Sequence, residues 1–160
     1  MHPRIKLVSE LYLITEKLVL KALKQMKPEV IDSRPIEKAN SFRWVFGHIT
    51  AHRYMLAKAI GLNENVEWEK LYSFGAPLQE SSAYPSIDEI TKAFSHISEK
   101  IRQRFPALTE DDLAGEAAFE IPGLEKTTAG TIAFLSLHES YHVGQLAYIM
   151  RLHDCDKLVG

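Results

Sequence analysis

Four separate stretches of the chain place apolar side chains every three to four positions, which is the spacing of one face of an α-helix. The stretches are residues 3–27, 41–61, 86–105 and 127–153. In the first of them, the predicted buried face consists of Ile5, Val8, Leu11, Thr15, Leu18, Ala22 and Met26. No run of alternating apolar and polar residues indicates a set of β-strands. The pattern therefore predicts an all-α protein.

Residues with known helix-end preferences mark most of these boundaries. Pro3 suits a first helical turn, and Pro28 ends the first stretch. Ser41 is a good N-cap for the second stretch, and Gly61 is well placed as its stop. The third stretch begins with a capping box at residues 86–89, in which a serine and a glutamate satisfy each other's free backbone amides. These signals support four helices of similar length.

Two long connections, residues 62–85 and 106–126, separate the predicted helices. The first is expected to hold one short helix and the second another helical turn, near residues 109–112. Loops of some twenty residues are unusual in a compact domain and often carry lids or binding surface. The predicted architecture is a four-helix bundle with long crossover loops, formed as a single domain over residues 1–160. In such bundles, metal and ligand sites form from inward side chains of facing helices.

Composition narrows the classes of function. The formal net charge of −2 and the isoelectric point near 6.4 give no electrostatic case for nucleic-acid binding. Cys155 is the only cysteine, so an intramolecular disulfide is impossible and a reducing compartment is expected. Charged residues such as Lys6 and Glu10 break the N-terminal run, which resembles neither a secretory signal nor a membrane span. We therefore expect a cytoplasmic protein that binds neither nucleic acid nor membrane.

Residues 138–142 read His-Glu-Ser-Tyr-His and carry the most specific chemical pattern in the chain. Histidines four residues apart on a helix are about 6 Å apart along the axis and about 40° apart around it. Both imidazoles can therefore reach one metal ion at the usual Zn–N distance of about 2.0–2.1 Å. A pair of hydrogen-bonded core histidines would show the same spacing.

The same letters form H-E-x-x-H, the motif in which zinc peptidases bind the metal and use the glutamate on a water. A peptidase needs a third ligand downstream, yet only 18 residues follow His142, and their acidic members lie close to the terminus. The strand that would bind a peptide substrate is missing from the pattern as well. The sequence therefore disfavours a peptidase.

His48 is the best candidate for a third ligand. It lies on the apolar face of the second stretch, with Trp44 and Val45 one turn before it. A set of His48, His138 and His142 would leave one or more coordination positions open, as catalytic sites do. His52 could instead close the set as a fourth ligand, but Arg53 suggests that the helix turns outward there, which favours a pocket-edge or surface position for His52.

The remaining histidines, His2, His96 and His153, are expected to be solvated. Histidine nitrogen suits zinc, nickel, copper and iron alike, so the sequence leaves the metal open.

Three further residues of the fourth stretch are candidates for roles around the site. Gln145 is one turn past His142 and could orient a ligand or a substrate, or serve only as a packing amide. Glu139 could bond a ligand imidazole, as carboxylates commonly do, although a surface or dimer salt bridge is favoured. Tyr141 could line the pocket, although core packing with a polar tip is favoured.

The chain resembles the DinB-like family, which includes the YfiT-type thiol transferases. The resemblance rests on the W-V-F-G-H-I segment at residues 44–49 and the H-E-S-Y-H-V-G-Q-L segment at residues 138–146. It implies that His48, His138 and His142 bind a divalent ion, with zinc or nickel expected. It also implies an up-down-down-up arrangement of the four helices and a homodimer.

The resemblance further implies a metal-dependent enzyme of thiol S-transferase type, which moves a low-molecular-weight thiol onto an electrophilic small molecule. The thiol would then be a co-substrate, and Arg43, Arg53 and Arg151 are the cations that could bind its carboxylate. The alternatives are a non-catalytic, stress-linked metal-binding dimeric scaffold and a metal-dependent hydrolase.

Overall fold

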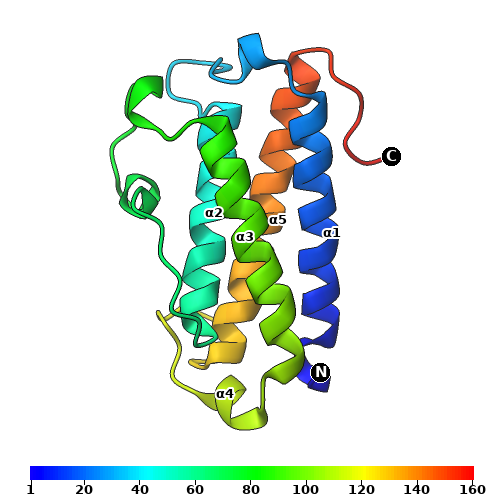
Figure 1. Cartoon of the computed structure of the whole chain (residues 1–160), viewed down its shortest axis with the longest axis vertical. Helices are drawn as coiled ribbons and strands as arrows, with labels where there is room; N and C mark the ends of the chain where they lie inside the picture. The colour runs from blue at the N-terminus through cyan, green and yellow to red at the C-terminus, as the bar shows by residue number, and fades with distance from the viewer.

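A computed structural model describes all 160 residues and is all-helical, as predicted, with five α-helices rather than four (Figure 1). The helices are α1 (Pro3–Gln25), α2 (Phe42–Ala59), α3 (Ile87–Arg104), α4 (Glu110–Ala114) and α5 (Thr128–Leu152). Four short 3-10 helices lie between them: η1 (Pro28–Val30), η2 (Glu69–Tyr72), η3 (Ser81–Ala83) and η4 (Phe105–Ala107). None of the helices combines the length and the apolarity that crossing a bilayer would require.

The four long helices lie alongside one another (Figure 1). In the view of Figure 1, α1 and α5 run upward, whereas α2 and α3 run downward. The last helix, α5, packs against both α1 and α2, and α3 packs against α2. Because α2 and α5 are direct neighbours, side chains on their facing sides meet in the interior.

The helix ends follow the local signals in the sequence. Ser41 Oγ accepts a hydrogen bond from the Trp44 amide at 3.2 Å, which caps α2. The capping box that begins α3 is present, with both of its reciprocal bonds formed. Gly61 follows α2 with a φ of 82°, a left-handed conformation that favours glycine. The short helix α4, which is the one beyond the four predicted, starts from a second capping box between Thr109 and Asp112.

The predicted buried face of α1 was partly wrong. Leu11 is 46 % exposed, and its neighbour Tyr12 and Val19 are buried instead. Exposed apolar side chains also occur at Leu7 and Ile14. Apolar residues thus occupy adjoining faces of α1, so the periodicity alone did not decide which face turns inward.

The connection of residues 62–85 folds back over α2 (Figure 1). Its η2 helix places the buried ring of Tyr72 directly over Gly47, where a Cβ atom would lie 2.1 Å from the tyrosine oxygen. The Tyr72 ring also packs against Trp44 and Trp68, at centroid distances of 5.9 and 5.6 Å. Gly47 is therefore required by this close approach rather than by its backbone angles.

A Gly47→Ala variant should be destabilised by about 1–3 kcal/mol, because the new methyl group displaces a ring that is packed on two sides. Gly144→Ala is the matched control, since Gly144 is also a mid-helix glycine but has no atom within 4 Å of the position that a methyl group would take. That variant should be neutral or more stable by about 0.5–1 kcal/mol. Urea unfolding of both variants measures the difference, and equal effects would contradict the contact.

Candidate metal centre

Three histidines from two neighbouring helices converge in the interior. His48 comes from α2, and His138 and His142 come from α5. The Nε2 atom of His138 lies 3.4 Å from that of His48 and 3.2 Å from that of His142. One ligand atom from each of the three residues lies within 4.8 Å of the other two, an arrangement that could hold a metal ion.

The spacing of these nitrogens fits tetrahedral coordination. Two ligands at a Zn–N distance of about 2.05 Å and the tetrahedral angle are about 3.3 Å apart. The two Nε2–Nε2 distances at His138 bracket this value. The ligand atoms of His48 and His142 lie within 4.8 Å of each other, so three nitrogens could occupy one face of a tetrahedron and leave the fourth direction for another ligand.

The ring tautomers inferred from the hydrogen bonds also favour a cation at this site. The Nδ1–H of His142 donates to Gln145 Oε1 at 2.8 Å, because an amide oxygen can only accept. Neutral His142 therefore directs an Nε2 lone pair at His138. The Nε2 of His138 can donate only one proton, so it cannot satisfy both neighbouring rings. A cation among the three Nε2 atoms would accept their lone pairs and remove this deficit of protons. The Nδ1 atoms of His48 and His138 are buried without a hydrogen-bond partner, and such a cation would leave them so.

All three candidate ligands are held in the neutral form that binds metals. Burial, followed by the neighbouring histidines His52, His142 and His138, lowers the pKa of His48 to about 2, although the Tyr72 backbone opposes this. Burial also lowers the pKa of His138 to about 3. Burial likewise lowers the pKa of His142, although its hydrogen bond to Gln145 opposes this.

These lowered pKa values predict that the metal-free protein loses stability as the pH falls below about 6.5. Above that pH the imidazoles are neutral in both the folded and the unfolded chain. Below it His48 and His138 bind protons in the unfolded chain but stay neutral in the folded protein. Each histidine that stays fully neutral lowers the free energy of unfolding by on the order of 2 kcal/mol at about pH 5, and by less where solvent screens its charge.

Urea unfolding of chelator-treated protein at several pH values measures this loss. A His48→Asn variant removes one such group and should show a shallower fall. A flat profile between neutral pH and pH 5 would contradict neutral, buried ligands.

His52 lies at the edge of the cluster, in agreement with the position favoured from the sequence. Its ring stacks on that of His138 at a centroid distance of 4.3 Å, and its Nδ1–H donates to the His48 carbonyl at 2.9 Å. It is half-buried and does not belong to the group of three converging nitrogens. The arrangement gives no fourth histidine ligand.

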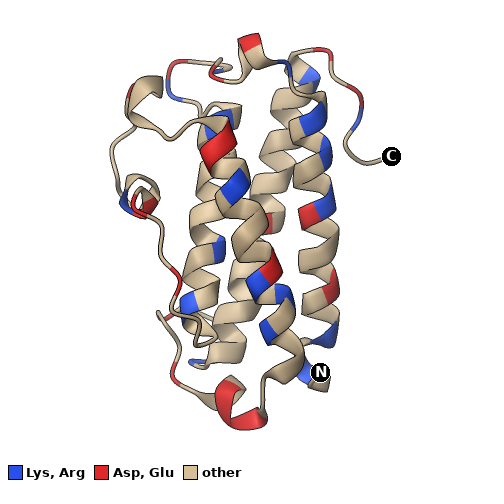
Figure 2. Cartoon of the chain, in the orientation of Figure 1, with Lys and Arg blue, Asp and Glu red and all other residues tan.

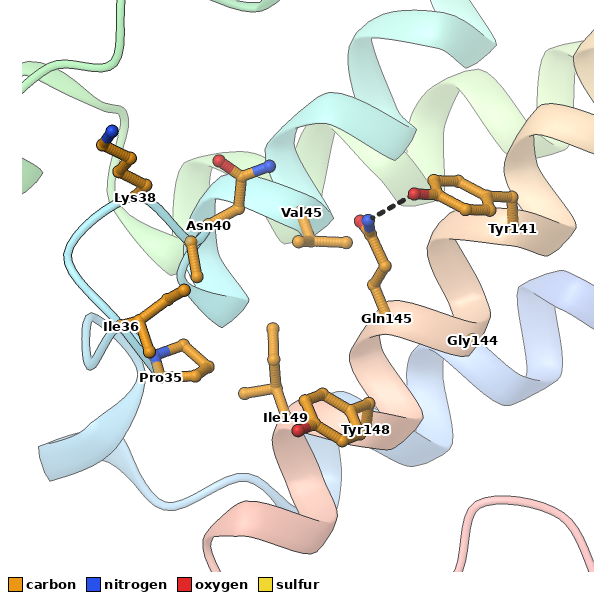
Figure 3. A pocket seen from close by; sticks show the side chains of 11 residues that line it. Pro35, Ile36, Lys38, Asn40, Val45, Tyr141, Gly144, Gln145, Tyr148 and Ile149 are labelled. Atoms are coloured by element: carbon orange, nitrogen blue, oxygen red, sulfur yellow. Dashed lines mark hydrogen bonds between the residues drawn. The ribbon is translucent and has the colours of Figure 1, made fainter.

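Gln145 links the cluster to the surface. Its amide oxygen holds His142, and its Nε2 donates to the Tyr141 hydroxyl at 3.2 Å (Figure 3). Gln145 therefore contacts the ring of one candidate ligand and an exposed tyrosine. Tyr141 does not pack in the core as favoured from the sequence, since it is 63 % exposed. Both residues line a cavity of about 650 Å³ between α5 and residues 35–40.

Glu139 does not make the surface or dimer salt bridge favoured from the sequence, because it is only 3 % exposed. Its carboxylate accepts two hydrogen bonds from Arg53, at 2.9 Å from Nε and 2.6 Å from the terminal nitrogen, and a further bond from the Thr15 hydroxyl. The carboxylate faces α1 and α2 and makes no hydrogen bond to His138 or His142. It is a structural group rather than a candidate catalytic one.

Arg53 was expected at an outward-facing position, which is wrong, because it is 2 % exposed. Its guanidinium also donates to the Tyr12 carbonyl at 3.1 Å and to the Ser98 hydroxyl, and it lies 4.4 Å from the centroid of the Phe94 ring. This buried network ties α1, α2, α3 and α5 together one turn away from the histidines. Arginine between apolar residues on a helix was the one sequence signal that could have indicated it.

The arginines considered for a thiol carboxylate are all engaged elsewhere. Arg43 pairs with Asp32 at 2.5 Å, and Arg151 donates to the Cys155 carbonyl at 2.7 Å. Arg53 is buried against Glu139. A carboxylate-bearing co-substrate therefore finds no free arginine among these three.

The remaining histidines lie away from the cluster. His2 caps the start of α1 and pairs with Glu110. His96 is half-exposed and bonds Glu64 at 2.9 Å, and His153 ends α5. None of the three contributes to the candidate site.

A second cavity, of about 760 Å³, opens directly beside the histidines. Both long connections contribute to it, as expected of loops that carry binding surface: residues 72–74 come from the first and residues 119–122 from the second. His52, Met55, Phe134, Leu135 and His138 complete its wall. We call it the loop cavity. It is the cavity that contains a candidate ligand, whereas the cavity of Figure 3 reaches the cluster only through Gln145.

Comparison with known families gives one match. The family model described as the DinB superfamily matches residues 12–146, a span that contains all three converging histidines. A comparison with curated proteins gives no match.

Proposed function

The chain belongs to the DinB superfamily, and from that premise we propose that it is a metal-dependent transfer enzyme of thiol S-transferase type. His48, His138 and His142 are the proposed ligands of a divalent ion, with zinc or nickel expected. The single observation that carries the proposal is the convergence of three neutral imidazole nitrogens at tetrahedral spacing beside a cavity. We further infer that the four long helices form a single up-down-down-up bundle domain around this site.

A bound divalent ion would supply positive charge that favours the thiolate form of a thiol, the nucleophilic form, at neutral pH. The protein's own residues would orient the metal ligands and hold the substrate. Gln145 fixes the tautomer and the orientation of His142 through its amide oxygen. The two long connections enclose the loop cavity, where an electrophilic substrate would be held next to His138. With its Nδ1 engaged, His52 leaves Nε2 as an acceptor for a group that enters this cavity.

Titration of the cobalt-substituted protein with a small thiol tests the proposal. An open coordination position predicts a saturable change in the visible spectrum on adding mercaptoethanol, and no such change with ethylene glycol, which lacks the sulfur. The proposal rests on an open position, so a spectrum that never responds to any thiol would contradict it. That result would favour an ion that only braces the helices.

A non-catalytic dimeric scaffold is the second candidate, and an exposed apolar face supports the dimer. Along α5, charged residues occur only at Glu139, which is buried, and at Arg151 near the end, so its ribbon is almost entirely tan in Figure 2. Exposed apolar side chains lie on this helix and on neighbouring α1: Leu7, Leu11, Ile14, Leu137, Tyr141, Tyr148 and Leu152. Patches of this kind commonly mark protein interfaces.

We propose that this face pairs two copies of the chain. Sedimentation should then give a mass near twice 18.2 kDa, and a Leu137→Glu variant should sediment as a monomer. A monomeric wild-type protein would contradict the pairing without bearing on the histidine site. A metal-dependent hydrolase would use the same ligands on water and is the third candidate.

A further inference from the structure

We propose that the loop cavity binds an uncharged, largely apolar small molecule as the substrate of the metal centre. This inference rests on the proposed function, since it names the class of molecule on which that site acts. The cavity lies beside a candidate ligand, has a volume of about 760 Å³ and falls in the range that drug-sized ligands occupy.

Apolar and aromatic side chains form most of the cavity wall. Phe119 packs edge-on against Phe134 at a centroid distance of 5.7 Å, and Phe134 lies 5.8 Å from the ring of His138. The three rings form a continuous aromatic wall that leads to the candidate metal ligands. Phe74 is fully exposed at the cavity rim, although burying such a side chain is favourable. An apolar molecule in the cavity would cover part of this surface.

The charges around the cavity disfavour an anionic substrate. No lysine or arginine lines it, and its single formally charged side chain is that of Glu120. This carboxylate pairs with Lys126 at 2.7 Å on the exposed rim. A phosphate or carboxylate bound along the phenylalanine wall would therefore lose its hydration without gaining a cationic side chain, and only the proposed ion at the histidine end would attract it.

The polar side chains of the wall include Ser73 and Glu120, and two imidazoles where the cavity meets the histidine cluster. His52 and His138 stand there side by side, with their rings stacked at 4.3 Å. A substrate that buries an apolar body against the phenylalanines would thus present its polar, reactive end to this pair. The cavity of Figure 3 offers a different surface, because Lys38 and Asn40 line it and no candidate ligand does.

Binding of two fluorescent probes with matched ring systems tests the inference. Phenylnaphthylamine is uncharged at neutral pH, and anilinonaphthalene sulfonate adds an anionic group to similar rings. The uncharged probe should bind one site per chain and at least about tenfold more tightly than the sulfonate. Loss of one aromatic wall residue, in Phe119→Ser or Phe134→Ser, should weaken it about tenfold or more. Circular dichroism confirms that each variant is folded.

Two further variants test which cavity binds the probe and how charge in the loop cavity affects binding. Ile36→Ser alters the cavity of Figure 3 and should leave binding of the uncharged probe unchanged. Glu120→Lys adds a cation to the loop cavity and should tighten binding of the sulfonate, with little effect on the uncharged probe. Equal affinity for both probes in the wild-type protein, or loss of binding in Ile36→Ser and not in Phe119→Ser, would overturn the inference.

His142→Ala separates this inference from the proposed function, because His142 does not line the loop cavity. The variant should lose the metal and still bind the uncharged probe. Metal binding without discrimination between the probes would overturn the substrate class and leave the metal centre standing. Probe binding as expected in a chain that binds no metal would overturn the proposed function and leave an apolar binding site.

Discussion

Replacing Glu139 with alanine will destabilise the metal-free protein by about 3–5 kcal/mol, because the buried guanidinium of Arg53 then keeps only the more distant Glu16, at 3.5 Å, as a counter-charge. The carboxylate and the guanidinium are 3 % and 2 % exposed, so water cannot replace the lost partner. Urea unfolding of the chelator-treated variant measures the loss.

The matched control is Glu99→Ala, which breaks an ion pair with Arg102 on the exposed face of α3. That pair should contribute no more than about 0.2–1 kcal/mol. Replacing both buried partners, in Arg53→Met with Glu139→Leu, should restore much of the stability lost in Glu139→Ala, because no unpaired charge remains. If Glu139→Ala costs no more than Glu99→Ala, the buried pair does not contribute as described.

Helix positions were predictable because their signals are local. The capping serines, the prolines and Gly61 each act within one turn of the residue that they affect, so their roles can be recognised in a short segment. The inward face of α1 was less well predicted, since Leu11 and Tyr12 are adjacent apolar residues and only packing against the other helices decides between them.

The Arg53–Glu139 pair could not be predicted, because it joins residues 86 positions apart. Each residue taken alone has the character of a surface group, and Glu139 also completes a peptidase-like motif. Only the packing of α2 against α5 brings the two charges together. The three histidines were easier to predict from the sequence, because one helix turn fixes the spacing of His138 and His142 and His48 lies on an apolar face.

Metal binding to His48, His138 and His142 is expected to give the second large change in stability. Zinc or nickel at about 100 times its dissociation constant should stabilise the wild-type protein by about 2.7 kcal/mol through binding to the folded state alone. The melting temperature should rise by about 5–11 °C. In His138→Ala and in His142→Ala this rise should vanish, because two nitrogens hold an ion far less tightly than three. His96→Ala should keep the full rise, since His96 lies on the exposed face of α3.

Metal analysis of protein purified without added metal tests the central claim most directly. The three-histidine centre predicts close to one divalent ion per chain in the wild-type protein and in His96→Ala, and close to none in His138→Ala or His142→Ala. A wild-type content near zero, together with a melting temperature that neither zinc nor nickel changes, would contradict it.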